Sequence, residues 1–179
     1  QALGLRAVPS SATLRQRFDA MGTQWSELAD QINRAVLGLH INGAPIDFGA
    51  LPTGHLPLDI DTFVMDNSDT KKEDVSRTYQ GVDGYTPIAA YLGNEGWSIG
   101  LELRAGSQHT AFETDYFLAR VFPRIERLVP ADAKVLLRQD SGFDGAHLLF
   151  LQAEEKARWT AMGRSFDFIT KWNPRKQDK

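Results

Sequence analysis

The sequence predicts an α/β fold in which helices flank a mixed β-sheet, with a helical lead at the N-terminus. Three observations support this: helical periodicity dominates the first part of the chain, strand-like apolar runs begin at residue 58, and helical segments separate the later runs. The chain has 179 residues, of which 42% are hydrophobic and 24% charged. This is enough for one domain with a sizeable core. We therefore expect a helical region over residues 1–50 and an α/β domain over residues 51–179.

The helical region is expected to contain two helices. The first begins at Ser10 or Ser11, which suit an N-cap, and ends at Gly22. The second has one apolar face, made by Trp25, Leu28, Ile32, Ala35, Val36 and Leu39. The stretch 41–57 is rich in glycine and proline and is expected to form a loop.

The α/β domain is expected to start with a strand, a polar excursion over residues 66–84, and a hairpin around the turn GNEG. Helices and strands then alternate, and Pro123 should either kink the first of these helices or lie near a break in it. The expected elements, in order, are strands 58–65, 85–93 and 97–106, helix 113–129, strand 133–140, helix 146–157 and strand 165–172.

This order predicts the sheet topology. An antiparallel meander followed by helical crossovers gives a mixed sheet with helices on its faces. Right-handed crossovers would lay the strand KVLLRQD beside the first strand, LDIDTFV. Asp61 and Asp140 are then expected at one end of neighbouring strands.

Composition narrows the classes of function. A net charge of −3 argues against nucleic-acid binding by bulk electrostatics, although it allows a local basic surface. Cysteine is missing, so disulfides and thiolate metal sites are excluded, and the four histidines show no zinc-binding spacing. With no apolar run of about 20 residues and no signal-peptide pattern, we expect a cytoplasmic protein without membrane contact. The first residue is Gln, and we expect the chain to be a piece of a longer protein.

Two carboxylates stand two positions apart in the first strand. Side chains alternate along a strand, so Asp59 and Asp61 should share a face. Burying an unpaired carboxylate costs several kcal/mol, on the order of a domain's stability margin, so such a pair needs a cation, a basic partner or water. A solvated strand end is the simpler interpretation and stays open.

Asp140 adds a third carboxylate at the end of the neighbouring strand. Carboxylates on adjacent strands repel each other, and Mg²⁺ is a common counter-charge for oxygen ligands. Such sites perform metal-assisted phosphoryl transfer, in which divalent ions activate a water or a 3′-hydroxyl and stabilise the leaving oxygen. Taken alone, RQDSGF is more typical of a β-turn after a strand, whereas the two motifs together, in this strand order, favour the metal site.

The sequence also resembles a known family. The motif LLRQDSGFD is the most specific element, followed by GYTPIAAYL and GLELRAGSQH, while LDIDT is the least specific. With these motifs the chain resembles the DDE transposases of bacterial insertion sequences, in the group whose second catalytic aspartate lies in R-x-D-S-G-F. The resemblance extends over about residues 58–175, and VPSSATLRQRFDA is similar to the family's upstream helical region.

The resemblance implies a ribonuclease-H-like fold with a D, D, E triad that binds two Mg²⁺ or Mn²⁺ ions and cleaves and joins transposon ends. It assigns the first aspartate to Asp61 and the second to Asp140. Asp59 points to the same face and is a reserve candidate, either as a ligand or as a group that orients one. The family's glutamate lies further downstream than Glu154 or Glu155, so the domain is expected to be partial and catalytically incomplete. The implied partner is double-stranded DNA, at transposon ends and target, and a homodimer of the full-length protein fits the resemblance.

Other residues are candidates for DNA contact. Basic side chains in loops or at strand ends could meet phosphates, although a solvated surface charge is the simpler interpretation for each. They are Lys71, Lys72, Arg77, Arg104, Arg138, Lys171, Arg175 and Lys176. An aromatic cluster, Tyr79, Tyr85, Tyr91 and Trp97, is expected to pack in the core rather than to stack on bases.

Two alternative functions remain. A non-catalytic DNA-binding or assembly domain derived from a transposase would also carry these motifs. A haloacid-dehalogenase-type phosphatase would explain the D-x-D of LDID, with the first aspartate as nucleophile. The phosphatase motif requires Thr or Val where Phe63 stands, and no doubly wound repeat of strand and helix follows.

Overall fold

The computed structural model of the chain describes residues 9–22, 24, 28, 31, 32, 35 and 47–174. Contacts within the chain divide it into Gln1–Asn42 and Gly43–Lys179. The first unit contains α1, Ser11–Met21, whose start is capped by a hydrogen bond from the Thr13 N–H to Ser10 Oγ at 3.2 Å. The first expected helix is thereby confirmed. The second, from Trp25 to Leu39, lies mostly outside the described residues.

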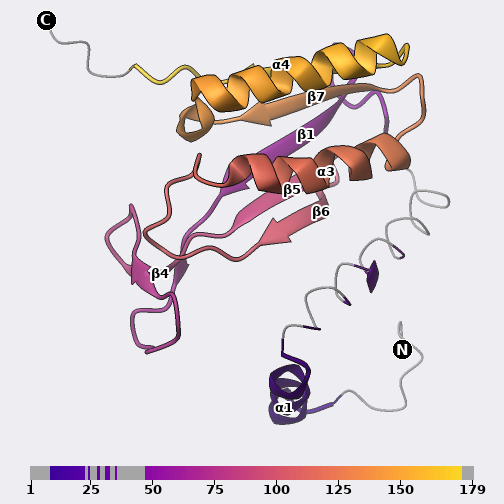
Figure 1. The fold of residues 1–179 in the computed structure, drawn as a ribbon. Helices are drawn as coiled ribbons and strands as arrows, with labels where there is room; N and C mark the ends of the chain where they lie inside the picture. The colour runs from indigo at the N-terminus through magenta and orange to yellow at the C-terminus, as the bar shows by residue number, and fades with distance from the viewer. Residues whose placement is uncertain are drawn as a thin grey trace, which may run out of the picture. The chain divides into compact units, whose positions relative to one another are not determined.

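The second unit is built on a five-stranded sheet with the order β6-β5-β1-β7-β8 (Figure 1). The strands are β1 His55–Thr62, β5 Ile88–Leu92, β6 Trp97–Glu102, β7 Lys134–Gln139 and β8 Ser165–Thr170. β1, β5 and β6 form an antiparallel meander, whereas β7 and β8 continue from β1 in parallel. The predicted mixed α/β sheet is confirmed, and its arrangement is compatible with a ribonuclease-H-like fold.

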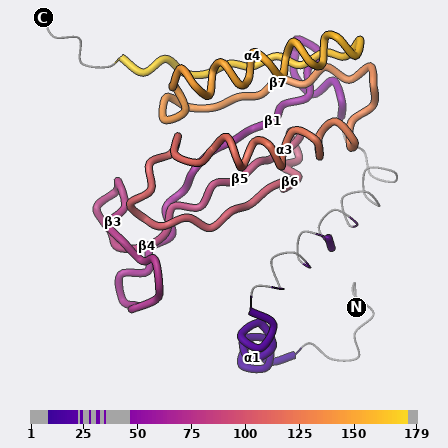
Figure 2. Tube along the Cα trace, viewed as in Figure 1, coloured from indigo at the N-terminus to yellow at the C-terminus, as the bar shows by residue number. Residues whose placement is uncertain are grey.

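Two helices, α3 Thr114–Leu128 and α4 Ala146–Ala161, cover one face of this sheet (Figure 2). The core forms between them and the sheet, where Leu58, Leu137, Phe117 and Trp159 are almost fully buried. α3 approaches β6 closely at Gly100, where a Cβ atom would lie 3.0 Å from Val121 Cγ2. Pro123 lies inside α3 and does not end it. None of the described helices has both the length and the hydrophobicity to cross a membrane.

A small second sheet follows β1, with the order β2-β4-β3. Its strands are β2 Met65–Asp66, β3 Ser76–Arg77 and β4 Asp83–Tyr85. The prediction of one strand over 58–65 and a plain excursion over 66–84 is therefore wrong. The chain leaves the large sheet at Phe63, whose N–H donates to the Pro87 carbonyl at 3.1 Å, and Gly84 then packs against Met65 so closely that a Cβ would collide with its carbonyl oxygen.

β1 also begins earlier than expected, at His55, within the predicted loop. Pro57 lacks an N–H group and is rarely found in a central strand. Its carbonyl accepts a hydrogen bond from Gly93 N–H at 2.9 Å, just beyond the end of β5. The nitrogen and carbonyl of a strand residue face the same neighbour, so the missing N–H of Pro57 faces Gly93. The Gly93 carbonyl accepts instead from Gly96 N–H at 3.2 Å, within the turn after β5.

Candidate functional site

The candidate site lies where β1 and β7 end side by side. In their parallel register, Asp59 pairs with Arg138 and Ile60 with Gln139. Asp61 and Asp140 are the next residues on each chain segment, so both reach the same edge of the sheet. The strand neighbourhood expected from the sequence is present, whereas the chemical role of the two aspartates stays a prediction.

Asp61 is exposed, yet its carboxylate is affected by the surrounding protein. Partial desolvation raises the pKa of Asp61 above its ordinary value, and the negative charges of Asp140 and Asp59 raise it further. A hydrogen bond from Thr62 N–H to Oδ1, at 2.7 Å, acts in the opposite direction. The charges of Asp61 and Asp140 are therefore close enough to repel, and a cation between them would relieve this repulsion.

Asp140 caps a short 3₁₀ helix, η1 Ser141–Phe143. Its Oδ1 accepts a hydrogen bond from Gly142 N–H at 2.8 Å, which is the side-chain turn expected of Asp-Ser-Gly. This bond fixes the orientation of the carboxylate at the strand end. The turn interpretation of RQDSGF and a role for Asp140 as a ligand are thus compatible.

Asp59 is engaged by Arg138 across the two strands. Arg138 Nε donates to Oδ1 at 2.7 Å and Nη2 donates to Oδ2 at 2.6 Å, which is a bidentate pair. Both side chains are 40% exposed. This pair compensates the charge of Asp59 and holds its carboxylate against β7, whereas the other N–H groups of the half-exposed Arg138 guanidinium are not used by Asp59. The reserve ligand role of Asp59 and the phosphate contact of Arg138 stay predictions.

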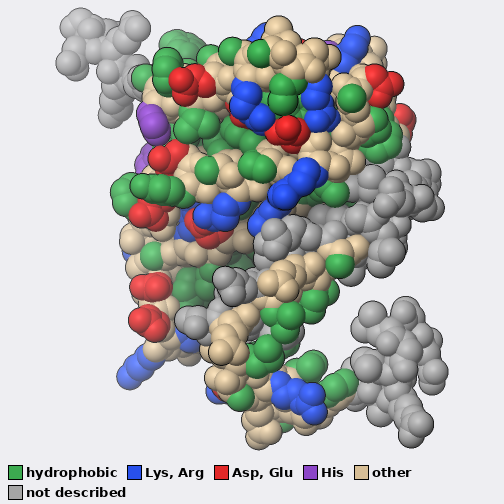
Figure 3. Space-filling view, turned by 45° about the vertical axis from the view of Figure 1, so that its right-hand side comes forward, with side chains coloured by type: hydrophobic (Ala, Val, Ile, Leu, Met, Phe, Trp, Pro, Cys, Tyr) green, Lys and Arg blue, Asp and Glu red, His purple; other side chains and the backbone are tan. Residues whose placement is uncertain are grey.

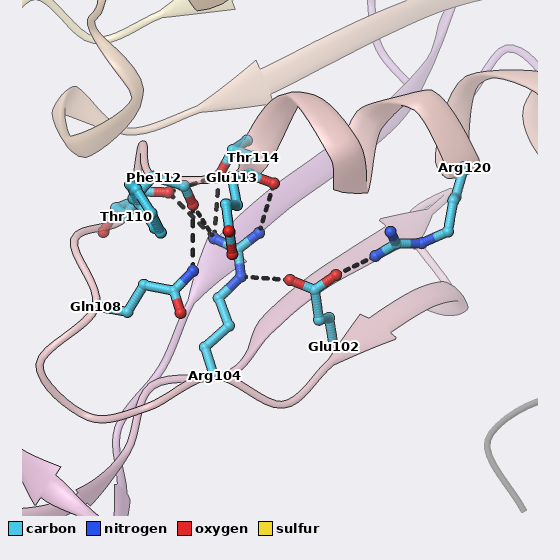
Figure 4. A network of polar contacts seen from close by, with 8 residues as sticks. All are labelled: Glu102, Arg104, Gln108, Thr110, Phe112, Glu113, Thr114 and Arg120. Carbon is cyan, nitrogen blue, oxygen red and sulfur yellow. Dashed lines mark hydrogen bonds and ion pairs between the residues drawn. The ribbon is translucent and has the colours of Figure 1, made fainter. Parts of the chain in front are cut away.

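Arg104 is a structural residue, so its expected phosphate contact is wrong. The residue is 4% exposed, and its guanidinium donates to Glu102 Oε1 at 2.7 Å and to Thr114 Oγ1 at 3.1 Å. Its other hydrogen bonds hold the segment that precedes α3 (Figure 4). These go to the backbone carbonyls of Thr110, Phe112 and Glu113. With its donors used inside the protein, Arg104 is not available to DNA.

The segment held in this way, residues 105–113, reaches the candidate site. Thr110 Oγ1 lies 3.2 Å from Thr62 Oγ1, directly after the first aspartate. A Cβ on Gly142 would lie 3.2 Å from Thr110 Cβ, so Thr110 also packs against the turn after the second aspartate. Sequence reasoning assigned no role to Thr110, although this residue directly follows GLELRAGSQH, one of the motifs that carry the family resemblance.

The remaining basic candidates are surface residues or lie outside the described chain. Lys71, Lys72 and Lys171 are exposed, and the Lys171 N–H donates to the Gln139 carbonyl at 3.1 Å, which places Lys171 beside the end of β7. Arg175 and Lys176 lie outside the described residues. The phosphate contacts proposed for these five residues remain predictions.

Acidic and basic side chains are interspersed over α3 and α4 (Figure 3). Arg158 pairs with Glu155 at 2.6 Å and with Glu126 at 2.8 Å. Glu155 is buried and also accepts from Trp159 Nε1 at 2.7 Å. This carboxylate therefore has a structural role on α4, in line with its exclusion from the catalytic triad.

The aromatic cluster is only partly internal. Tyr85 is buried, and its hydroxyl donates to the Glu73 carbonyl at 2.7 Å. Tyr91 is 37% exposed and Tyr79 is 70% exposed. The core prediction is wrong for Tyr79, because this residue occupies the turn between β3 and β4 at the surface of the small sheet.

A separate ion cluster lies near the start of β1. Asp167 on β8 accepts from Lys156 Nζ at 2.5 Å, and His55 Nε2 lies 3.4 Å from its other oxygen. The hydrogen bond from Lys156 is the main reason why the pKa of Asp167 is lowered, and the charges of Lys156 and His55 add to it. This cluster joins α4 and β8 to β1, at the end of β1 opposite the candidate site.

The residues present fit part of a divalent metal site. Among the described residues, no group of three or more His, Asp or Glu side chains is arranged to hold a metal ion. Asp61 and Asp140 nevertheless offer carboxylate oxygens, the ligand type of Mg²⁺ and Mn²⁺. The raised pKa of Asp61 also fits a position where a cation would be favourable. The described residues thus contain two candidate ligands, Asp61 and Asp140, and water would complete the coordination of an ion held by them.

Comparison with known proteins gives one structural neighbour to report. No protein-family model matches the chain, and no curated protein matches it. A cryo-EM structure of a piggyBac transposase synaptic complex with hairpin DNA superposes with a TM-score of 0.38 and 12% sequence identity. The superposition covers 71% of this chain and 24% of that chain, so this chain spans about a quarter of the neighbour's length. Similarity at this level does not establish a shared fold or function.

Proposed function

We propose that this chain belongs to the catalytic domain of a DNA transposase, with Asp61 and Asp140 as two acidic ligands of Mg²⁺ or Mn²⁺. The observation that carries the proposal is the parallel pairing of β1 with β7, which brings the aspartates of LDIDT and RQDSGF to one edge of the sheet. The resemblance of these motifs to DDE transposases supplies the reaction class.

The chain's own residues would orient the two carboxylates. Thr62 N–H holds Asp61, Gly142 N–H holds Asp140, and Thr110 packs between the segments that carry them. The chemistry supplied when divalent ions are bound is activation of a water or 3′-hydroxyl and stabilisation of the leaving oxygen of a phosphodiester. The substrate in this proposal is double-stranded DNA, cleaved and joined at transposon ends.

A third acidic ligand is required by this proposal and is not assembled among the described residues. We therefore expect the 179-residue chain to bind divalent ions weakly and to leave DNA uncleaved. Nicking of plasmid DNA by the purified chain with Mg²⁺, lost in Asp140→Ala, would instead show that residues 1–179 contain the whole catalytic set.

The phosphatase alternative fits the structure poorly. Its nucleophile would be Asp59, yet both oxygens of Asp59 accept hydrogen bonds from Arg138. The sheet also contains the antiparallel strands β5 and β6 in place of a doubly wound parallel arrangement. A non-catalytic module derived from a transposase remains the second candidate, since it would keep the strands without needing the metal.

Metal binding separates these candidates. Mn²⁺ affinity is measured by electron paramagnetic resonance for the wild type, Asp61→Asn and Asp140→Asn. The matched control is Asp132→Asn, because Asp132 is exposed in the turn before β7, at the opposite end of that strand. We expect each site variant to weaken Mn²⁺ binding by at least about tenfold, and the control to leave it unchanged. Equal affinities in all four proteins would reject the metal site and favour the non-catalytic module.

A further inference from the structure

A second candidate site adjoins the aspartate pair. A pocket of about 370 Å³ lies between the turn after β3 and the segment after β6. Its lining includes Arg77, Tyr79, Gln108, His109 and Thr110. No acidic side chain lines it, although the whole chain has a net charge of −3. The pocket therefore offers aromatic, cationic and hydrogen-bonding groups on an otherwise acidic protein.

The two walls of the pocket are fixed to each other. Gly106 packs so closely on the small sheet that a Cβ would collide with the carbonyl oxygens of Ser76 and Gly84. The Ser107 N–H donates to Ser76 Oγ at 2.9 Å. Because these contacts join the segment after β6 to β3 and β4, the pocket is held by the fold and does not depend on one side-chain rotamer.

The groups that line the pocket are suited to a polar aromatic ligand. Tyr79 is 70% exposed, and the Arg77 side chain is 68% exposed, with a 3.4 Å contact to Asp83. His109 Nδ1 accepts from Ala111 N–H at 3.1 Å, so a neutral His109 ring carries its proton on Nε2. A stacking surface, a guanidinium and an imidazole donor thus line one pocket.

We propose that this pocket binds one unpaired nucleotide of a nucleic-acid strand. The base stacks on the ring of Tyr79, and Arg77 contacts a flanking phosphate. Gln108, whose amide nitrogen donates to the Phe112 carbonyl at 3.3 Å, keeps its side-chain oxygen for the base edge, beside the donor on His109.

The pocket also has a defined relation to the aspartate pair. Thr110 lines the pocket and lies 3.2 Å from Thr62, the residue after Asp61. A strand held in the pocket would therefore pass next to the end of β1. The proposal goes beyond strand cleavage and does not require it, since nucleotide binding needs neither Asp61 nor a metal ion.

Binding of fluorescein-labelled single-stranded 16-mers, one of DNA and one of RNA, tests the proposal. Fluorescence anisotropy gives the affinity of the 179-residue chain and of its variants without added metal. We expect Tyr79→Ala to weaken binding by about 5- to 150-fold, as for loss of one base stack, and Tyr79→Phe to retain wild-type affinity. Arg77→Ala should weaken binding. It should also reduce the slope of the logarithm of the binding constant against the logarithm of the salt concentration by about 0.7, which corresponds to one phosphate contact.

Two control variants distinguish loss of the pocket from loss of any exposed aromatic or basic side chain. Phe150→Ala and Arg127→Ala remove an exposed aromatic and an exposed basic side chain from the helices, and both should bind like the wild type. The nucleotide assay contains no metal ion, so loss of metal affinity and loss of nucleotide affinity are measured separately and are distinguishable. Dependence on Tyr79 in the DNA or the RNA arm supports the pocket and identifies the strand type. Wild-type affinity of Tyr79→Ala for both oligonucleotides, or equal losses in Tyr79→Ala and Tyr79→Phe, would overturn the proposal.

Discussion

Replacing Arg104 by methionine tests whether this buried arginine holds the segment next to the candidate site. Methionine keeps much of the length and apolar volume but removes every donor. A hydrogen bond to a charged group contributes about 1.5–3 kcal/mol, and the bonds to Glu102, Phe112 and Thr114, at 2.7, 3.1 and 3.1 Å, have good lengths. The contacts to Thr110 and Glu113, at 3.4 and 3.3 Å, are longer and weaker.

Simple addition would overestimate the loss, because the acceptors keep second partners. The Thr110 carbonyl also accepts from Thr114 Oγ1 at 2.6 Å, the Phe112 carbonyl accepts from Gln108, and Glu102 pairs with Arg120. We therefore expect Arg104→Met to lower the free energy of unfolding by about 3–5 kcal/mol, the range for removing one partner of a buried ion pair. For a chain of this size, that corresponds to a fall in Tm of roughly 6–20 °C.

Thermal unfolding followed by circular dichroism measures this change, with Arg127→Met as the matched control. Arg127 is exposed on α3 and donates only to its own helix, at the Pro123 carbonyl, among the bonds described, so its replacement should change stability by less than about 0.5 kcal/mol. Arg104→Lys should recover part of the loss, since lysine keeps the charge near Glu102 but lacks the planar fork. If Arg104→Met and Arg127→Met unfold at the same temperature, the buried network does not stabilise the fold and the reasoning is refuted.

Three further predictions concern charge and packing. Because the pKa of Asp61 is raised in the folded protein, ionisation of this carboxyl opposes folding. Asp61→Asn should therefore raise Tm at neutral pH. The gain should disappear at acidic pH, where Asp61 is protonated in both the folded and the unfolded protein. Gly100→Val should cost about 1–3 kcal/mol in urea unfolding, because a Cβ would lie 3.1 Å from Phe117 Cζ; a neutral result would mean that α3 shifts freely. The pKa of Asp167 is lowered in the folded protein, so the ionised carboxylate stabilises the fold above the ordinary aspartate range, and this stabilisation is lost as the pH falls through the lower folded pKa. Between about pH 5 and 2, the free energy of unfolding should therefore fall more in the wild type than in Asp167→Asn.

The large sheet could be predicted because its strands bury a regular set of side chains. Leu58 and Ile60 alternate with Asp59 along β1, and the apolar pair is buried while the acid is not. The small sheet could not be predicted in this way, since β2 and β3 have two residues each and no buried apolar position. Its pairing depends on close backbone approach at Gly84, which leaves no periodic pattern in the sequence.

The sequence located the aspartates of the candidate site but not their surroundings. The parallel neighbourhood of Asp61 and Asp140 follows from a meander plus a crossover, so strand order alone was sufficient. The burial of Arg104 depends on the carbonyls of the segment before α3 lying around its guanidinium, and this arrangement has no local signal in the sequence. Exposure of Tyr79 likewise depends on a turn whose flanking strands were too short to recognise.

The two acids of LDID differ because of their positions relative to the end of β7. Asp59 lies opposite Arg138 within the paired part of the two strands, where the register brings a guanidinium to its carboxylate and the charges compensate each other. Asp61 lies one residue past the last paired position, opposite a second acid, so its charge is opposed and not compensated by its neighbour. Alternation on the strand makes these residues equivalent, and only the cross-strand partner separates them. A single register therefore gives β1 one internally neutralised carboxylate and one that a bound cation would stabilise.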